Sequence, residues 1–172
     1  MRRGLSNRSG FTLVELLIVV IILGVLAAIA IPQFTSSTED AKLSSLDTSL
    51  AELRGAIELY YHQHNAVYPG AKKDTDGSDV ATAAEAATAF VKQLTVYSAS
   101  TGKTAVTKDA TYMYGPYLKV GLPKNPYNGD ATVTCDIVTT DITVGASGGT
   151  AGWKFYIKTG RLLANDGTHD AR

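Results

Sequence analysis

The feature that most constrains this chain is an apolar run that follows a short basic head. Residues 1–10 carry three arginines and no acidic residue. Residues 11–31 contain only three residues outside the apolar set: Thr12, Glu15 and Gly24. As a helix this run measures roughly 32 Å, which matches the hydrocarbon core of a bilayer. The sequence therefore predicts a membrane-spanning helix whose basic end stays in the cytoplasm and whose following residues lie outside it.

Two simpler interpretations of this run remain open. A cleavable secretory signal has the same charged start, and Ala28-Ile29-Ala30 supplies a small-x-small pattern before a cut. A signal anchor would simply hold the rest of the chain to the membrane. Neither explains Glu15, an ionisable residue that is costly in an apolar segment unless a cation neutralises it. The run contains no Lys or Arg, so Glu15 predicts a partner from elsewhere.

Composition narrows the class of protein further. The 172 residues include 16 basic and 16 acidic side chains, and this zero formal charge gives no support to nucleic-acid binding. A hydrophobic content of 45% argues against a disordered polyelectrolyte. The single cysteine, Cys135, excludes an internal disulfide and a cysteine-rich zinc site. The rigidity of the chain must therefore come from packing.

The helix is expected to continue beyond the membrane. Apolar residues recur at steps of three and four along one stripe: Leu43, Leu46, Leu50, Leu53, Ile57 and Tyr60. The pattern predicts one helix from about Phe11 to Tyr61, whose first half packs with other subunits and whose second half packs on its own domain. Gly24 and Pro32 lie within it. Because proline removes an intrahelical hydrogen bond, they predict a kink or an unwound stretch near residues 24–32.

Beyond Asn65 the pattern changes to turns, one short helix and strands. Thr82 and Glu85 have the spacing of a capping box, and the apolar face that follows predicts a helix over residues 80–97. The next segment, Ser98–Ala110, is rich in Ser, Thr, Lys and Gly and is expected to be a surface loop.

Strands are expected in the last third of the chain. Three strands are predicted, at residues 132–138, 153–158 and 161–164, and the first of them shows alternation of apolar and polar residues. The last two are expected to form a hairpin through Thr159-Gly160. The predicted fold class is therefore α+β, in which a long N-terminal helix with a protruding hydrophobic half packs on a small C-terminal antiparallel sheet.

The segment Gly10-Phe11-Thr12-Leu13-Val14-Glu15, with its basic leader and a long apolar helix containing Pro32, resembles the N-terminus of type IV pilins and type II secretion pseudopilins. In that family a prepilin peptidase on the cytoplasmic side cuts after the glycine and methylates the new N-terminal residue. The resemblance implies cleavage between Gly10 and Phe11 and N-methylation of Phe11. It divides the chain into a leader at 1–10, a transmembrane or filament-core helix at 11–34, an amphipathic helical half at 35–64 and a periplasmic α+β domain at 65–172.

The same resemblance implies assembly into a helical filament. Cleavage creates an α-amine four residues before Glu15, and staggered subunits can set the amine of one chain against the carboxylate of its neighbour. Phe11, Glu15 and Pro32 are the expected assembly residues. The implied partners are further copies of the chain, prepilin peptidase, an inner-membrane assembly platform and minor pilins or pseudopilins, with no nucleic acid. The implied location is the inner membrane, with a cytoplasmic N-terminus and a periplasmic C-terminal domain, and then a periplasmic or extracellular filament.

The second half of the chain resembles, more weakly, the major pseudopilin of type II secretion systems. The similar segments are residues 122–127 and 152–156, followed by a short hairpin. Many pilus-forming pilins close a C-terminal loop with two cysteines, which Cys135 alone does not allow. Major pseudopilins bind calcium in this loop, and Asn165, Asp166 and Asp170 offer suitable oxygen ligands. An exposed acidic tail with a turn at Asp166-Gly167 is the alternative, and no other cofactor is expected.

No active site is visible in the sequence, and we do not expect an enzyme. His62 and His64 lie two positions apart and would point to different faces of a helix, so solvated side chains are expected in place of a metal pair. Cys135 lies in a strand pattern without an identifiable histidine partner, which favours a buried small side chain. The expected function is a filament subunit, most closely the major pseudopilin of a type II secretion system. A type IV pilus pilin for adhesion or motility and a membrane-anchored periplasmic binding domain are the alternatives.

Overall fold

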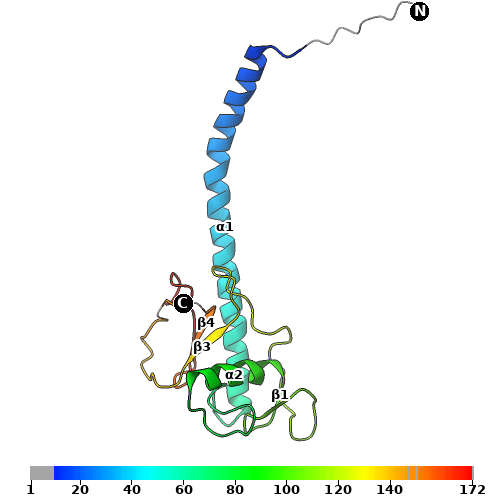
Figure 1. Cartoon of the computed structure of the whole chain (residues 1–172), viewed down its shortest axis with the longest axis vertical. Coiled ribbons are helices and arrows are strands. Elements are labelled where there is room, and N and C mark those ends of the chain that lie inside the picture. Colours follow the sequence, from blue (N-terminus) through cyan, green and yellow to red (C-terminus); the bar gives the residue numbers. More distant parts are fainter. Residues whose placement is uncertain (1–9, 147, 150, 172) are drawn as a thin grey trace, which may run out of the picture. The chain divides into compact units, whose positions relative to one another are not determined.

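The computed structural model describes residues 10–146, 148–149 and 151–171. The elements in this part of the chain are, in order, α1 (Leu13–Gln63), α2 (Ala83–Thr95), β1 (Tyr97–Ser98), β2 (Thr104–Ala105), β3 (Val133–Asp136), β4 (Trp153–Tyr156) and β5 (Arg161–Ala164) (Figure 1). The predicted α+β class, with one long N-terminal helix and a small C-terminal sheet, is confirmed. Apart from Gly10, the predicted leader lies outside the described residues.

The chain divides into two compact units, Met1–Ala41 and Lys42–Arg172. In the first unit the apolar side chains of α1 are uncovered, and Leu13 and Phe34 are 86% and 74% exposed. An 18-residue window of α1 has a mean hydropathy of 3.1 and no buried residue. By length and composition, α1 is therefore able to cross a membrane, and it is the one such helix among the described residues.

The backbone of α1 stays helical through residues 24–32, so the predicted unwound stretch is wrong. Proline removes a single intrahelical bond, and the helical bonds on either side hold this turn together. The side chain of Pro32 lies outside the described part of the structure, and the kink and its role in assembly stay predictions. At its other end α1 stops where Asn65 and Ala66 adopt left-handed φ angles of 55° and 59°.

The apolar stripe predicted on the second half of α1 forms one wall of the core. Five of its six residues are at most 2% exposed, and Leu43 is half-buried. The five buried residues belong to the same cluster as Phe90 of α2 and Phe155 of β4, whose ring centroids lie 4.7 Å apart. Burying one such side chain contributes about 1.5–3 kcal/mol. This packing makes the C-terminal half of α1 part of the globular unit.

The capping box predicted for α2 is present, although the helix is shorter than predicted. Thr82 Oγ1 accepts the amide of Glu85 at 3.2 Å, and Glu85 Oε2 accepts the amide of Thr82 at 3.3 Å. The helix ends at Thr95 because Val96 has extended backbone, with φ −127° and ψ −178°. Tyr97, which was predicted to be helical, therefore belongs to β1.

The C-terminal sheet has the order β3-β4-β5 and is mixed, whereas an antiparallel sheet was predicted. β4 and β5 form the predicted antiparallel hairpin, in which Trp153 pairs with Ala164 and Tyr156 with Arg161. β3 pairs with β4 in parallel. Parallel neighbours need a long crossover connection, which residues 137–152 supply between these two strands.

The segment predicted to be a surface loop contains a short strand pair. Tyr97 of β1 pairs with Ala105 of β2 in antiparallel register, and Ser98 pairs with Thr104. Ser98 also exchanges backbone hydrogen bonds with Tyr114, at 3.0 and 3.1 Å. This segment lacks apolar alternation, so nothing in its local pattern indicates a strand.

The predicted exposure is correct for one of two side chains discussed in the sequence analysis and wrong for the other. Cys135 is 4% exposed on β3, as predicted, and burial raises the pKa of its thiol to about 12. His64 was predicted to be solvated, and that prediction is wrong because it is 1% exposed. Its Nδ1 donates to the carbonyl of Tyr60 at 2.9 Å, its Nε2 accepts from Ser98 Oγ at 3.0 Å, and its ring stacks on Tyr60. His62 is exposed as predicted.

Candidate functional site

The N-terminal candidate site centres on Glu15 in the first turn of α1. The amide and the hydroxyl of Thr12 both donate to Glu15 Oε2, each at 2.8 Å, and the Glu15 amide donates to Thr12 Oγ1 at 3.2 Å. This reciprocal pair is a capping box, which satisfies backbone N–H groups at the helix start and places a carboxylate at the positive end of the helix dipole. The motif-based prediction missed Thr12, although Thr-x-x-Glu spacing signals such a cap.

The helix that carries Glu15 supplies no nearby cation. Lys42 is the first basic residue after Phe11, and 27 positions of sequence separate it from Glu15. The residues around Glu15 are apolar and uncovered, with Phe11 85% exposed and Leu16 57% exposed. Any apolar partner that covered these side chains would also bury the Glu15 carboxylate. A buried carboxylate is strongly unfavourable without a cation, and the source of that cation stays a prediction.

The predicted cleavage point lies just before the first helical turn. Gly10 and Phe11 are exposed and have non-helical backbone. Exposed backbone outside regular structure is where peptide bonds are most readily cleaved. The position therefore suits a peptidase, and cleavage and N-methylation here stay predictions.

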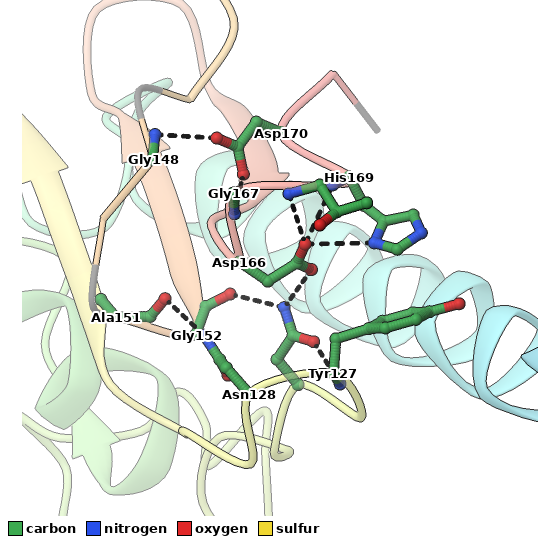
Figure 2. A network of polar contacts seen from close by, with 11 residues as sticks. Tyr127, Asn128, Gly148, Ala151, Gly152, Asp166, Gly167, His169 and Asp170 are labelled. Carbon is green, nitrogen blue, oxygen red and sulfur yellow. Dashed lines mark hydrogen bonds and ion pairs between the residues drawn. The ribbon is translucent and has the colours of Figure 1, made fainter.

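The second candidate site is the C-terminal segment that carries the predicted calcium ligands (Figure 2). Asn165 follows β5 directly, and its Oδ1 accepts the amide of Gly149 at 3.1 Å. Asp170 accepts two further amides, from Gly167 on Oδ1 and from Gly148 on Oδ2, each at 2.8 Å. The oxygens of these two side chains therefore hold backbone N–H groups of two neighbouring loops.

Asp166 lies deeper, with its side chain 1% exposed. Its Oδ2 accepts from Asn125 Nδ2 at 3.0 Å. Its Oδ1 accepts the amides of Thr168 and His169 and the Nδ1–H of His169, at 3.0, 2.9 and 3.1 Å. Burial raises the pKa of Asp166, but these four donors outweigh it and hold the pKa below its ordinary value. Asp166 is thus an ionised carboxylate whose partners are N–H donors.

Asn125 and His169 join this segment to the rest of the globular unit, and sequence reasoning missed both. Asn125 Nδ2 also donates to the carbonyl of Gly152 at 3.0 Å. The ring of His169 lies on Tyr127, with centroids 3.9 Å apart. Asn125 and Tyr127 fall in the segment that resembles pseudopilins, but a local motif does not indicate which distant residues it meets.

The three predicted ligands are not arranged to fit calcium. Calcium takes about six to eight oxygen ligands at about 2.3–2.6 Å, whereas these oxygens accept N–H groups at 2.8–3.1 Å. Among the described residues, no group of three or more His, Cys, Asp or Glu side chains is placed to hold a metal ion. Calcium binding stays a prediction that this geometry does not support.

Comparison with known proteins places the N-terminal site in a family context. The family described as "Prokaryotic N-terminal methylation motif" matches residues 5–31, which include Gly10, Phe11 and Glu15. The chain is 29% identical over 147 residues to type II secretion system core protein G of Vibrio cholerae, covering 84% of each chain. In these findings, in the α+β fold and in the long apolar helix, the chain is similar to type IV pilin-like structural subunits.

Other relatives include both secretion and pilus proteins. The chain is 36% identical over 67 residues to type II secretion system core protein G of Pseudomonas aeruginosa, which is 39% of this chain and 46% of that protein. It is 34% identical over 89 residues to the type IV major pilin protein PilE of Neisseria gonorrhoeae, covering 52% and 51%. The chain thus spans about half the length of these two relatives. No solved structure matches significantly.

Proposed function

We propose that this chain is a filament-forming subunit, most closely the major pseudopilin of a type II secretion system, processed between Gly10 and Phe11 by a prepilin peptidase. The observation that carries the proposal is Glu15, a carboxylate at the head of an uncovered apolar helix, with no lysine or arginine between residues 11 and 41. Before assembly the apolar half of α1 spans the inner membrane, with the basic leader in the cytoplasm and the globular unit in the periplasm.

Processing supplies the missing cation. The cut after Gly10 creates an N-methylated amine on Phe11, and it leaves Thr12 in place, so the Thr12–Glu15 cap survives. When subunits stack with an axial stagger, the amine of one chain neutralises the Glu15 carboxylate of another. The surrounding apolar side chains supply affinity, and the charge pair selects one alignment among the many that apolar packing permits.

Loss of the leader also makes the subunit easier to extract from the membrane. The leader holds three arginines, and a helix with a cationic end resists extraction from the bilayer. Cleavage therefore acts as a licensing step that removes the anchor and creates the assembly amine together. The partners in this account are an inner-membrane assembly platform, minor pseudopilins and further copies of the chain, which form a periplasmic filament.

A type IV pilus pilin is the second candidate, favoured by the similarity to PilE. The secretion assignment is preferred because the Vibrio core protein G match extends over 84% of both chains. The single cysteine is buried on β3, so it is not placed to close a C-terminal loop through a disulfide. Deletion of the gene separates the two: the proposal expects a loss of protein secretion with surface fibres intact, and the pilin alternative expects the reverse.

Mass spectrometry of the membrane-extracted protein tests processing directly. The proposal expects N-methyl-Phe11 as the first residue. An intact Met1 terminus would favour a membrane-anchored binding domain, and a terminus at Ile31 would favour a secreted domain released by a signal peptidase. A Gly10→Leu variant is a useful comparison, since it blocks cleavage after residue 10 and should accumulate in the membrane at full length.

A further inference from the structure

The C-terminal segment carries an inference that does not depend on filament assembly. We infer that residues 165–170 are closed onto the globular unit by N–H donors of their own chain in place of a calcium ion (Figure 2). The segment holds the three side chains that the family resemblance offers as calcium ligands. The oxygens of all three face N–H groups.

Asp166 shows most clearly that N–H donors occupy the positions where a cation would bind. A carboxylate oxygen has about two lone-pair sites, and Oδ1 of Asp166 already accepts three N–H donors, while Oδ2 accepts one from Asn125. Two of these donors are backbone amides, of Thr168 and His169, within the same tight turn. A cation that bound Oδ1 would have to turn these amides away from an oxygen whose side chain is 1% exposed. The chain would then lose the hydrogen bonds that hold this turn in place.

Asp170 and Asn165 close the segment against the loop before β4. Asp170 accepts the amide of Gly148 through its side chain and the amide of Ala146 through its carbonyl, each at 2.8 Å. Asn165 accepts the amide of Gly149, and a side chain at Gly149 would collide with Asn165. The two loops are therefore joined by backbone donors at adjacent positions, which is the role that a bridging ion would otherwise perform.

His169 is the residue that links this closure to the rest of the globular unit. Its Nδ1–H donates to Asp166, and its ring packs on Tyr127 at 3.9 Å. Lys42 of α1 lies over the ring of Tyr127, with Nζ 5.7 Å from the centroid. A contact chain thus runs from Asp166 through His169 and Tyr127 to α1, and it consists of protein groups throughout.

Thermal unfolding of the full chain in detergent micelles tests this inference. Melting temperatures are measured by near-ultraviolet circular dichroism in millimolar calcium, in millimolar magnesium and in excess EGTA. We expect the same melting temperature for the parent in all three. We expect His169→Ala to melt about 2–4 °C lower, the shift for one lost hydrogen bond in a chain of this size. His62→Ala is the matched control, because His62 is exposed on α1, and it should melt with the parent.

His169→Asn provides a second variant in case the alanine variant does not fold. Its side-chain amide can donate to Asp166 from nearly the position of Nδ1, but it lacks the ring that packs on Tyr127. It should therefore recover part of the loss. A melting temperature that rises by several degrees in calcium and not in magnesium would overturn the inference, as would identical melting of His169→Ala and His62→Ala. Neither result depends on polymerisation, so the proposed function stands or falls separately.

Discussion

α1 and α2 begin with the same local device in different surroundings. At α2, Thr82 and Glu85 exchange hydrogen bonds, and Lys73 pairs with the Glu85 carboxylate at 3.1 Å. At α1, Thr12 and Glu15 exchange the same hydrogen bonds. No lysine or arginine occurs between residues 11 and 41, and the three arginines of the leader lie outside the described residues, so a chain that has lost its leader would have no equivalent of Lys73 near α1.

The difference shows what each helix start is for. The cap of α2 is completed within the globular unit, and its carboxylate is partly exposed. It therefore stabilises the helix without a cation from another molecule. The cap of α1 fixes its carboxylate at the helix end but leaves the charge to be neutralised once apolar neighbours surround it. The α2 site is complete in the folded chain, and under the proposed function the α1 site is half of an intermolecular site.

Glu15→Leu is the strongest way to break this comparison. The variant should still insert into the membrane, because its helix is more apolar, but filament yield should fall on the order of tenfold or more as the neighbour's amine loses its carboxylate. Sedimentation of sheared filaments measures the yield, and carbonate extraction measures insertion. Glu85→Leu is the matched control and should keep a normal yield. Equal yields from Glu15→Leu and the parent would remove the basis of the account.

Paired alanine substitutions sharpen the contrast between the two units. Phe155 is fully buried, so Phe155→Ala should lower the free energy of unfolding of the globular unit by about 3–5 kcal/mol. Leu17 is 59% exposed, so Leu17→Ala should leave that free energy unchanged and lower filament yield. Denaturant unfolding followed by Trp153 fluorescence gives the first quantity, and sedimentation gives the second. A large loss of unfolding free energy in Leu17→Ala would contradict this division.

The pH dependence of the free energy of unfolding tests the globular unit through His64. Burial lowers the pKa of His64 below its ordinary value, so the folded state disfavours the charged ring. Its contribution to stability is complete above the unfolded-state pKa of about 6.5 and is lost as the pH falls through the lower folded value. In that window the free energy of unfolding should fall by up to about 1.4 kcal/mol per pH unit.

Denaturant titrations at several pH values measure this slope. His64→Gln should remove the contribution of His64 to the slope of unfolding free energy against pH. His62→Gln, on the exposed face of the same helix end, should leave the slope unchanged. Parallel profiles for the parent and His64→Gln would show that the buried ring does not set the acid response.

The smallest expected effects come from the two capping threonines. Thr82→Ala should lower the free energy of unfolding by about 1 kcal/mol and leave filament yield unchanged. Thr12→Ala should do the opposite, lowering the yield modestly because the Glu15 carboxylate is less well positioned. Serine at either position keeps the hydroxyl and should restore the parent's behaviour. If both alanine variants changed only the free energy of unfolding, or both changed only filament yield, the contrast between the two helix starts would be contradicted.

Features with a local cause were predictable from the sequence. The buried stripe of α1 follows from its spacing of three and four, the start of α2 follows from Thr82 and Glu85, and the β4–β5 hairpin follows from the turn at Thr159-Gly160. The motif around Gly10 and Glu15 is equally local, which is why the motif was recognised without the structure.

Features that join distant segments were not predictable. The burial of His64 depends on Ser98, and the parallel β3–β4 pairing depends on a crossover whose path no local pattern reveals. The C-terminal closure depends on Asn125 meeting Asp166. The family resemblance predicted calcium ligands among the oxygen-bearing side chains of this segment. In the folded chain these oxygens accept backbone amides and the side chains of Asn125 and His169, and no local sequence pattern indicates these donors.

Solid-state NMR on assembled filaments tests the central claim most directly. Filaments are grown from a mixture of chains labelled with ¹⁵N at Phe11 and other chains labelled with ¹³C at the Glu15 carboxylate. A nitrogen–carbon dipolar coupling in the mixed filaments reports a contact between different molecules. The account predicts this coupling, at a nitrogen–carbon separation of about 3.5 Å, because the amine would lie about 2.8 Å from a carboxylate oxygen. Its absence from well-formed mixed filaments would show that Glu15 is not neutralised by a neighbour's amine.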